Sequence, residues 1–342
     1  MYIKRNLSLD LLLRYSWPIL TPALLWAAMV LSAYHLLGWT FLSFSFQPIT
    51  VIGIAVSFLI GFKNNQSYDR FWEGRKIWGA IVNYSRTWAN QVLHLVTNLE
   101  NSAIAKEELA HHHQVLIHRH IAWLHALRIQ LRQPVSFSLK ENKLVEQFMD
   151  RHRNNELICE TIAPYISETE VEEVRHRRNV ATHLVKNQGR YLRALRKEGL
   201  VNGFDLLMLM KCLEECYNFQ GRCERIKNTP FPRQYAFFGK VFTYIFVLLL
   251  PLGLLDVFIG SSATASPMPS IDIFLFLIVS VLTTWIFLTW ELVGNNSEDP
   301  FENRSSDVPM TALTRTIEID LRDMLDESEL PEKLQPKDNI LY

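Results

Sequence analysis

The feature that most constrains the fold is the uneven distribution of charge along the 342 residues. Residues 17–62 contain no Lys, Arg, Asp or Glu, and residues 241–303 contain no Lys or Arg. The whole chain nevertheless carries 35 basic and 35 acidic residues. Long runs without charge are typical of segments that cross a bilayer, because unpaired charge is disfavoured in hydrocarbon. We therefore predict an integral membrane protein with a second, charged part.

Four apolar segments in these runs are predicted transmembrane helices: residues 17–39, 49–62, 237–258 and 271–290. A helix rises ~1.5 Å per residue, so about 20 residues cross a hydrocarbon core of ~30 Å. The second segment is short for a full span, which fits a helix screened by neighbours or extending into protein-lined water. The first follows basic residues as in a signal peptide, but it is too long for one and shows no clear cleavage site.

The loops between the spans predict the topology. Loops 40–48 and 259–270 contain no Lys or Arg, whereas the N-terminus, the middle block and the tail all do. By the positive-inside rule, both termini and the middle block face the cytoplasm. The predicted parts are residues 1–62 with two spans, 63–236 as a cytoplasmic helical domain, 237–293 with two more spans, and 294–342 as a cytoplasmic tail.

The fold class predicted from these patterns is all-α. The second span continues without proline as an amphipathic helix to about Asn98, and no alternating run is long enough for a strand. Further helices are predicted at residues 109–132, 138–151, 150–159, 167–197, 203–226 and, in the tail, 311–325.

One face of the second span carries a stripe of large apolar side chains. Ile54, Phe58 and Phe62 recur at i, i+4 and i+8, which places them on one side of a helix. The stripe then turns polar at Asn65 and Asp69. A face that changes from apolar to polar along one helix suits a conduit, whereas an ordinary apolar stripe faces lipid or packs in the core.

Two interpretations of Asp69 follow from its place after the stripe, where Asn65 and Gln66 are its polar neighbours. If Asp69 faces a pore, several copies form a carboxylate ring that favours cations. Alternatively it pairs with Arg70 or Arg75 on the same or a neighbouring helix, since a partly buried Asp usually has a partner.

Other acidic residues lie at the ends of the later spans. Asp256 and Asp272 flank the outer loop with no basic residue nearby, which makes the outer mouth attractive to cations. Glu291 lies at the inner end of the fourth span, where a carboxylate is expected to have a partner or a function. These charges favour monovalent cations.

Histidine and cysteine spacings bear on metal binding and pH sensing. His111, His118 and His125 recur every seven residues, and His113 and His120 repeat the interval. This helix is interpreted either as a pH-sensing surface or as a solvated or subunit-facing surface. Cysteines follow one face of a later helix, without a CxxC pair, which favours buried reduced thiols over a metal site; they are Cys212, Cys216 and Cys223.

Several function classes lack their motifs in this sequence. There is no Gly-rich phosphate loop, no G-x-S-x-G elbow and no HExxH zinc motif, so an enzyme is not expected. The zero net charge argues against a nucleic-acid partner. An ion channel and a membrane-tethered scaffold or signalling protein, whose cytoplasmic helices bind a partner, are the two remaining hypotheses.

Three dispersed motifs resemble the bestrophin family in its bacterial branch, and the resemblance covers nearly the whole chain. They are SYDRFWEGR at residues 67–75 followed by Trp78-Gly79, CERIKNTPFP at 223–232, and EDPF at 298–301. The resemblance implies a homopentameric ion channel in the bacterial inner membrane, with no enzymatic activity. Animal and plant members are anion channels, including chloride channels, and some bacterial members favour cations.

The resemblance also assigns site residues. The second span of each subunit lines one central pore in the bilayer, and the family's apolar neck matches Ile54, Phe58 and Phe62. A cytoplasmic aperture matches Phe231, which lies between two prolines. The EDPF residues are expected to brace the tail against the cytoplasmic block; they are Glu298, Asp299, Pro300 and Phe301. Residues 329–342 resemble a segment that embraces a neighbouring subunit, and a disordered tail is the alternative.

A calcium site, as found in animal members after the EDPF-like motif, is not expected here. Residues 302–307 read ENRSSD, with too few carboxylates and with Arg304 among them. Calcium takes about six to eight oxygen ligands, several of them carboxylates. Glu302 also replaces a usual glycine, so the local turn is expected to differ. No cofactor is predicted.

Overall fold

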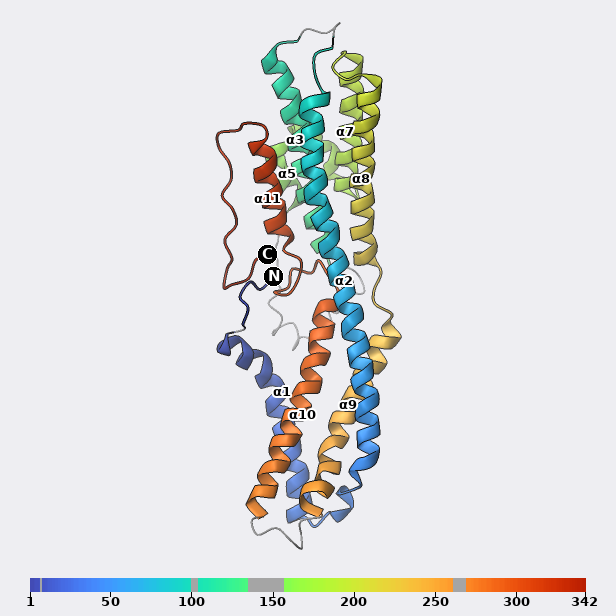
Figure 1. Cartoon of the computed structure of the whole chain (residues 1–342), viewed down its shortest axis with the longest axis vertical. Helices are drawn as coiled ribbons and strands as arrows, with labels where there is room; N and C mark the ends of the chain where they lie inside the picture. Colours follow the sequence, from blue (N-terminus) through green and yellow to red (C-terminus); the bar gives the residue numbers. More distant parts are fainter. Residues whose placement is uncertain (7, 100–103, 135–156, 261–268) are drawn as a thin grey trace. The chain divides into compact units, whose positions relative to one another are not determined.

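The computed structural model describes residues 1–6, 8–99, 104–134, 157–260 and 269–342, which form the helices of Figure 1. These residues divide into two compact units. Residues 4–70 and 230–299 are called the span unit, and residues 1–3, 71–229 and 300–342 the helical unit. Within the described ranges the extended pairing is limited to isolated bridges of Ile340 with Tyr2 and Lys337. The all-helical prediction is confirmed.

The span unit contains four helices long and apolar enough to cross a membrane, as predicted. They are α1 (Leu9–Leu36), the first part of α2 (Phe46–Leu95), α9 (Arg233–Leu255) and α10 (Pro269–Glu298). Short helical turns follow α1 at Thr40–Leu42 and α9 at Asp256–Gly260. The helix of the second span begins at Phe46, three residues before the predicted start, and continues to Leu95, close to the predicted end at about Asn98.

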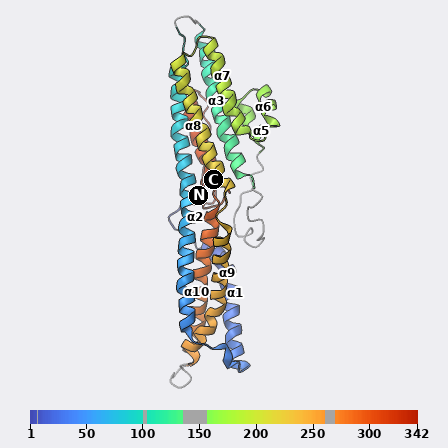
Figure 2. The ribbon, with the colours of Figure 1, turned by 90° about the vertical axis from the view of Figure 1, so that its right-hand side faces the viewer.

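Close packing between α2 and α9 depends on small residues. A Cβ added at Gly53 of α2 would lie 2.8 Å from the Phe246 ring of α9, and one added at Gly253 of α9 would collide with Ile49 of α2. On the other side of the bundle, α1 packs along α10. The first part of α2 lies at the margin of the span unit in both Figure 1 and Figure 2.

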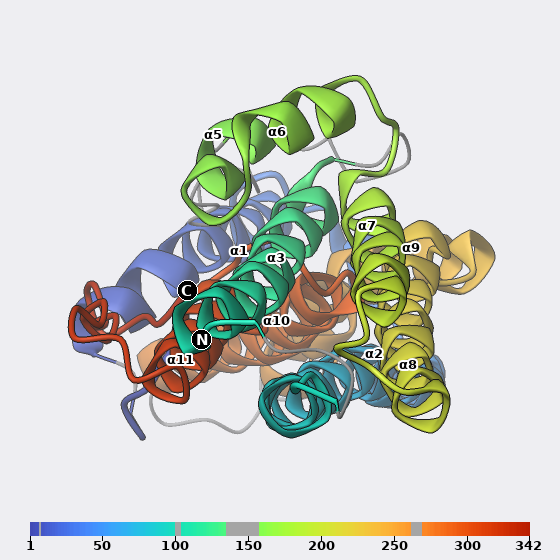
Figure 3. The same cartoon turned by 90° about the horizontal axis from the view of Figure 1, so that it is seen from above.

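The helical unit is built around α3 (Lys106–Arg132), which packs against α7 on one side and α11 on the other (Figure 3). Its core includes Trp78, Trp88 and Trp123. The remaining helices are α5 (Ile158–Ile162), a 3₁₀ turn (Ala163–Tyr165), α6 (Glu168–Arg175), α7 (Val180–Lys197), α8 (Gly203–Asn228) and α11 (Met310–Asp323).

The predicted helix 167–197 is wrong as a single element, because the chain forms α6 and α7 with a break between them. Asn179 caps α7, and its Oδ1 accepts the Thr182 N–H at 3.0 Å. Exposed Arg177 and Arg178 precede this cap. The predicted helix 138–151 lies outside the described residues, and of 150–159 only the end is described, where α5 begins.

The two ends of the chain pair with each other inside the helical unit (Figure 1). The Leu341 N–H donates to the Met1 carbonyl at 2.8 Å, and the Ile3 N–H donates to the Asn339 carbonyl at 3.0 Å. The Ala312 N–H of α11 donates to the Tyr342 carbonyl at 2.7 Å. The end of the tail is therefore ordered, and the alternative of a disordered tail is wrong because these residues have backbone partners.

Candidate functional site

The apolar stripe predicted on α2 is exposed in the chain. Ile54, Phe58 and Phe62 are 67%, 74% and 44% exposed, whereas Val56 and Ile60 between them are buried in the span-unit core. α2 therefore packs one face against the bundle and leaves the face with the three large side chains uncovered. This exposure is what a surface shared with other subunits, with lipid or with a water-filled path requires.

The exposed face continues into polar residues. Asn65 and Asp69 are exposed, and Gln66 is half-buried. Within the described part of the chain Asp69 has neither a hydrogen bond nor an ion pair. Its neighbour Arg70 turns to α10 instead and donates through Nε to the Glu298 carbonyl at 2.8 Å. A pair between Asp69 and Arg70 of the same chain is thus not formed.

A buried ion pair lies behind the stripe. Lys63 and Glu291 are both buried, and Lys63 Nζ lies 2.5 Å from Glu291 Oε1 and 2.6 Å from Asn295 Oδ1. The expectation that Glu291 has a partner is confirmed. Sequence reasoning missed Lys63, although it is the first charged residue after the charge-free run and Glu291 is the first acidic residue at the inner end of the fourth span.

Phe231 is placed differently from the neck residues. It is only 6% exposed, and its ring centroid lies 6.3 Å from that of Tyr235. The Tyr235 ring lies 6.1 Å from the ring of Phe62. An aromatic series in the span unit therefore connects the residue matched to the aperture with the last residue of the neck.

The EDPF motif contributes to both units. Glu298 of α10 is buried with its carboxylate 3.8 Å from Arg233 of α9, and Asp299 lies 4.0 Å from Arg70 of α2. These contacts tie the inner ends of α2, α9 and α10 together. In the helical unit Phe301 is fully buried, and a Cβ added at Gly74 would lie 3.0 Å from its ring.

The turn after the motif is built on one carboxylate. Phe301 and Asn303 have positive φ values of 73° and 60°. Asp307 accepts their N–H groups at 3.0 and 2.9 Å and that of Val308 at 2.6 Å. Burial raises the pKa of Asp307, while these hydrogen bonds act in the opposite direction.

The carboxylates of residues 302–307 are both engaged in contacts of this chain. Glu302 forms a buried ion pair with Lys227, and both oxygens of Asp307 accept backbone N–H groups. Among the described residues, no group of three or more His, Cys, Asp or Glu is placed to hold a metal ion.

The histidines of α3 do not share one environment. His111 is exposed and His118 contacts Glu327 at 2.6 Å, but His120 and His125 are buried. The interpretation as a solvated or subunit-facing surface is wrong for these two, because α3 is covered on all sides between Leu116 and Ile129. Burial lowers the pKa of His125, and it lowers that of His120 to about 3.

His120 makes stability depend on pH. Its Nε2 lies 2.9 Å from Ser85 Oγ. Its folded pKa of about 3 lies below the ordinary 6.5, so the unfolded chain takes up the proton first and stability falls as pH drops from 6.5 towards 3. From pH 7 to 5 this group removes about 2 kcal/mol. His120→Gln should abolish this share of the loss of stability between pH 7 and 5, measured by unfolding in detergent. Replacement of exposed His111 by Gln should leave the loss unchanged. Equal losses of stability in wild type and both variants would contradict this account.

The predicted buried thiols are confirmed. Cys212, Cys216 and Cys223 are buried and free. Burial raises the pKa of Cys212 to about 12 and raises that of the other two as well. These cysteines are therefore neutral thiols of the helical core.

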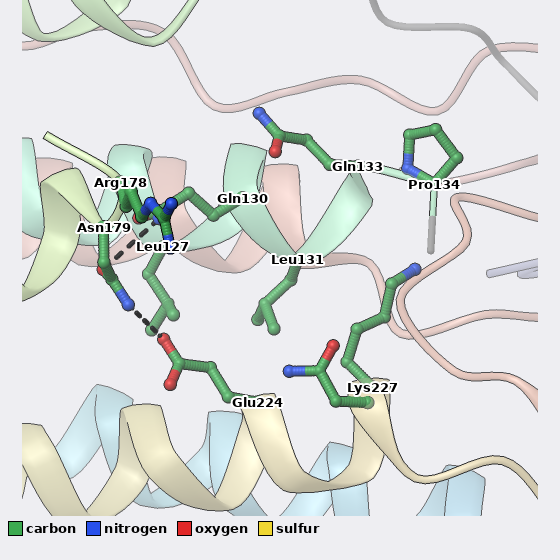
Figure 4. Close-up of a pocket in the computed structure, with 10 residues that line it drawn as sticks. Leu127, Gln130, Leu131, Gln133, Pro134, Arg178, Asn179, Glu224 and Lys227 are labelled. Atoms are coloured by element: carbon green, nitrogen blue, oxygen red, sulfur yellow. Dashed lines mark hydrogen bonds between the residues drawn. The ribbon is translucent and has the colours of Figure 1, made fainter. Parts of the chain in front are cut away.

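A cleft of about 450 Å³ in the helical unit lies between the end of α3, the α6–α7 connection and the end of α8 (Figure 4). Its polar side chains largely satisfy one another. Gln130 Nε2 donates to Asn179 Oδ1 at 3.3 Å, and Asn179 Nδ2 donates to Glu224 Oε1 at 2.8 Å. Lys227 pairs with Glu302. The cleft therefore presents few free groups to a ligand.

Comparison with known families decides the class of this membrane protein. A family model described as Bacterial/Fungal Bestrophin protein matches residues 7–323. The chain belongs to the bestrophin family. The resemblance seen in the three sequence motifs is thus confirmed.

Curated relatives of this bestrophin are named as channel-forming proteins. The voltage-dependent anion channel-forming protein YneE of Escherichia coli is 27% identical over 296 residues, covering 86% of this chain and 82% of that protein. A voltage-dependent anion channel-forming protein of Mesorhizobium japonicum is 28% identical over 300 residues, covering 87% and 81%. One of Ralstonia nicotianae is 28% identical over 297 residues, covering 87% and 83%.

Solved structures share the fold of this bestrophin. The crystal structure of a bacterial bestrophin homolog from Klebsiella pneumoniae matches with a TM-score of 0.70 and 24% identity, covering 91% of this chain and 98% of that one. A crystal structure of a membrane protein variant matches with a TM-score of 0.72 and 23% identity, covering 91% and 98%.

Proposed function

We propose that this bestrophin is a passive ion channel, assembled as a homopentamer, in which α2 of each subunit lines a central pore. The observation that carries the proposal is the exposed face of α2, where Ile54, Phe58 and Phe62 lead into Asn65 and Asp69. The family and the names of its curated relatives support a channel rather than an enzyme. Five subunits are the expectation from the family resemblance.

The three apolar side chains form the neck in this proposal. An apolar ring offers ions no ligands and gates by wetting and dewetting, so small changes in its radius decide conduction. Asn65, Gln66 and Asp69 line the wider, polar path beyond it. Phe231 serves as a second constriction, and its contact with Tyr235, which also touches Phe62, supports coupling between the two.

The proposed topology places both termini and residues 63–236 in the cytoplasm of a bacterial inner membrane. The positive-inside pattern supports this orientation. The pairing of the two chain ends inside the helical unit supports a common side for both termini and that unit. Residues 1–62 and 237–293 form the membrane part, and residues 294–342 form a tail whose exposed residues contact a neighbouring subunit.

The permeant ions proposed are small and monovalent. The names of the relatives favour anions. Exposed Asp69, together with Asp256 and Asp272 at the outer ends of the spans, favours cations. The neck residues are uncharged and therefore do not themselves discriminate between anions and cations.

Reversal potentials across planar bilayers under a NaCl gradient test the function and its selectivity. We expect currents from the purified protein. Asp69→Asn should shift the anion-to-cation permeability ratio towards anions by at least about tenfold, because one charge at roughly 6 Å in water changes cation and anion occupancy about threefold each, in opposite directions. Absence of current would contradict the channel. An unchanged ratio in Asp69→Asn would remove Asp69 from the pore lining.

A membrane-tethered scaffold is the second candidate. It is favoured by exposed apolar side chains at the start of α8, where Phe204, Leu207 and Met208 lie uncovered. Such a surface fits a partner protein as well as a neighbouring subunit. Native mass measurement in detergent separates the candidates: five copies support the channel, and a monomer supports the scaffold.

A further inference from the structure

Charge is almost absent from the membrane-spanning part of α2, yet a lysine follows the neck directly. Lys63 is next to Phe62 in the chain, so their Cα atoms are ~3.8 Å apart. Its side chain does not join the exposed stripe but is buried on the opposite side, towards α10. A cation therefore lies within about one helix diameter, ~10 Å, of the proposed ion path.

One carboxylate balances this cation. Glu291 Oε1 lies 2.5 Å from Lys63 Nζ, and Asn295 Oδ1 is the second acceptor at 2.6 Å. The other carboxylate oxygen of Glu291 is buried and has no hydrogen-bond partner in the part of the chain that the structure describes. Lys63 is thus the main compensation for Glu291, and the two together carry no net charge.

The surrounding contacts hold the pair in place. Asn64 Nδ2 donates to the Trp290 carbonyl at 3.2 Å, and a Cβ added at Gly294 would lie 2.8 Å from Asn64 Oδ1. α2 and α10 are therefore in close contact at this level, which leaves Lys63 little room to leave Glu291. Water is excluded from both charged groups, so their field is weakly screened.

We propose that the Lys63–Glu291 pair is a selectivity determinant. The positive charge of Lys63 and the negative charge of Glu291 cancel behind the neck, which keeps the electrostatic potential at the neck close to zero. This inference rests on the proposed channel function. An apolar neck cannot choose between ions by contact, so charges close behind it have a large influence on the ion that passes. Removing the charge of either residue leaves the charge of the other uncompensated and changes the electrostatic potential at the neck.

The sizes of the expected effects follow from Coulomb's law. One unit charge at ~10 Å with an effective dielectric constant of about 20 changes the occupancy of an ion on the order of tenfold. Glu291→Gln leaves Lys63 uncompensated in every subunit and should raise the anion-to-cation permeability ratio by at least that factor, because the field favours anions and disfavours cations. Lys63→Met leaves Glu291 uncompensated and should lower the ratio by a similar factor. The double variant should return close to wild type.

The test is a set of reversal-potential measurements on reconstituted wild type, both single variants and the double variant. Opposite shifts that cancel in the double variant support the proposal. Shifts in the same direction, or none, in conducting variants overturn it, since a merely structural pair has no reason to shift selectivity with opposite sign.

A charge swap covers the case in which single variants do not assemble, because an unpaired buried charge is destabilising. Lys63→Glu combined with Glu291→Lys restores a neutral pair. A wild-type permeability ratio in this variant supports the proposal, and an altered ratio or a lost channel overturns it. Absence of current from the wild-type protein would instead contradict the channel function. Failure of the selectivity proposal and failure of the proposed function are therefore distinguishable.

Discussion

Phe58→Ala should raise the current through reconstituted channels on the order of tenfold. Phe58 is the most exposed of the three stripe residues and lies in their middle. Replacing its ring by a methyl group in every subunit widens the apolar constriction and makes wetting easier. A wetting barrier lower by about 1.4 kcal/mol corresponds to a tenfold gain. Single-channel conductance and open probability in planar bilayers measure it.

The matched control is Phe274→Ala on α10. Phe274 is also a large, exposed aromatic residue of a candidate span, but it is outside the α2 stripe. Its removal should leave single-channel currents unchanged. If Phe58→Ala behaved like Phe274→Ala, the neck would not be formed by these residues.

Asp307→Ala should destabilise the helical unit by about 3 kcal/mol or more. The substitution leaves the N–H groups of Phe301, Asn303 and Val308 without their acceptor. A buried donor without a partner loses about 1–3 kcal/mol. The left-handed conformations of Phe301 and Asn303 would also lose their support. We expect the thermal midpoint in detergent to fall by about 6–12 °C.

Asp323→Ala provides the comparison for Asp307→Ala. Asp323 is exposed at the C-terminal end of α11, where an acidic residue is not favoured by the helix dipole. Its removal should change stability by less than about 0.5 kcal/mol. Similar midpoints for the two variants would show that Asp307 does not hold the turn.

The membrane part of the fold was predictable because one physical property dominates there. Charge-free runs located all four spans, and the period of Ile54, Phe58 and Phe62 predicted a shared face of α2. That this face is uncovered in the chain required the structure, because periodicity alone does not distinguish a core stripe from an exposed one.

Pairings between distant segments were not predictable from local patterns. Lys63 and Glu291 are separated by 228 positions, and nothing near either residue identifies the other. The burial of His120 depends on Trp88 and Trp123 from two helices. The break between α6 and α7 was missed because helical propensity outweighed the capping signal of Asn179.

Cysteine accessibility at Asn65 tests most directly whether the exposed face of α2 lines the ion path. Asn65→Cys introduces an exposed thiol on α2, whereas Cys212, Cys216 and Cys223 are buried and Cys159, on α5 in the helical unit, is half-buried. A charged, thiol-reactive methanethiosulfonate reagent should reduce the current of Asn65→Cys channels by more than half while leaving wild type unaffected. If mass measurement shows one more modified thiol in Asn65→Cys than in wild type and the current is unchanged, ions do not pass along this face of α2.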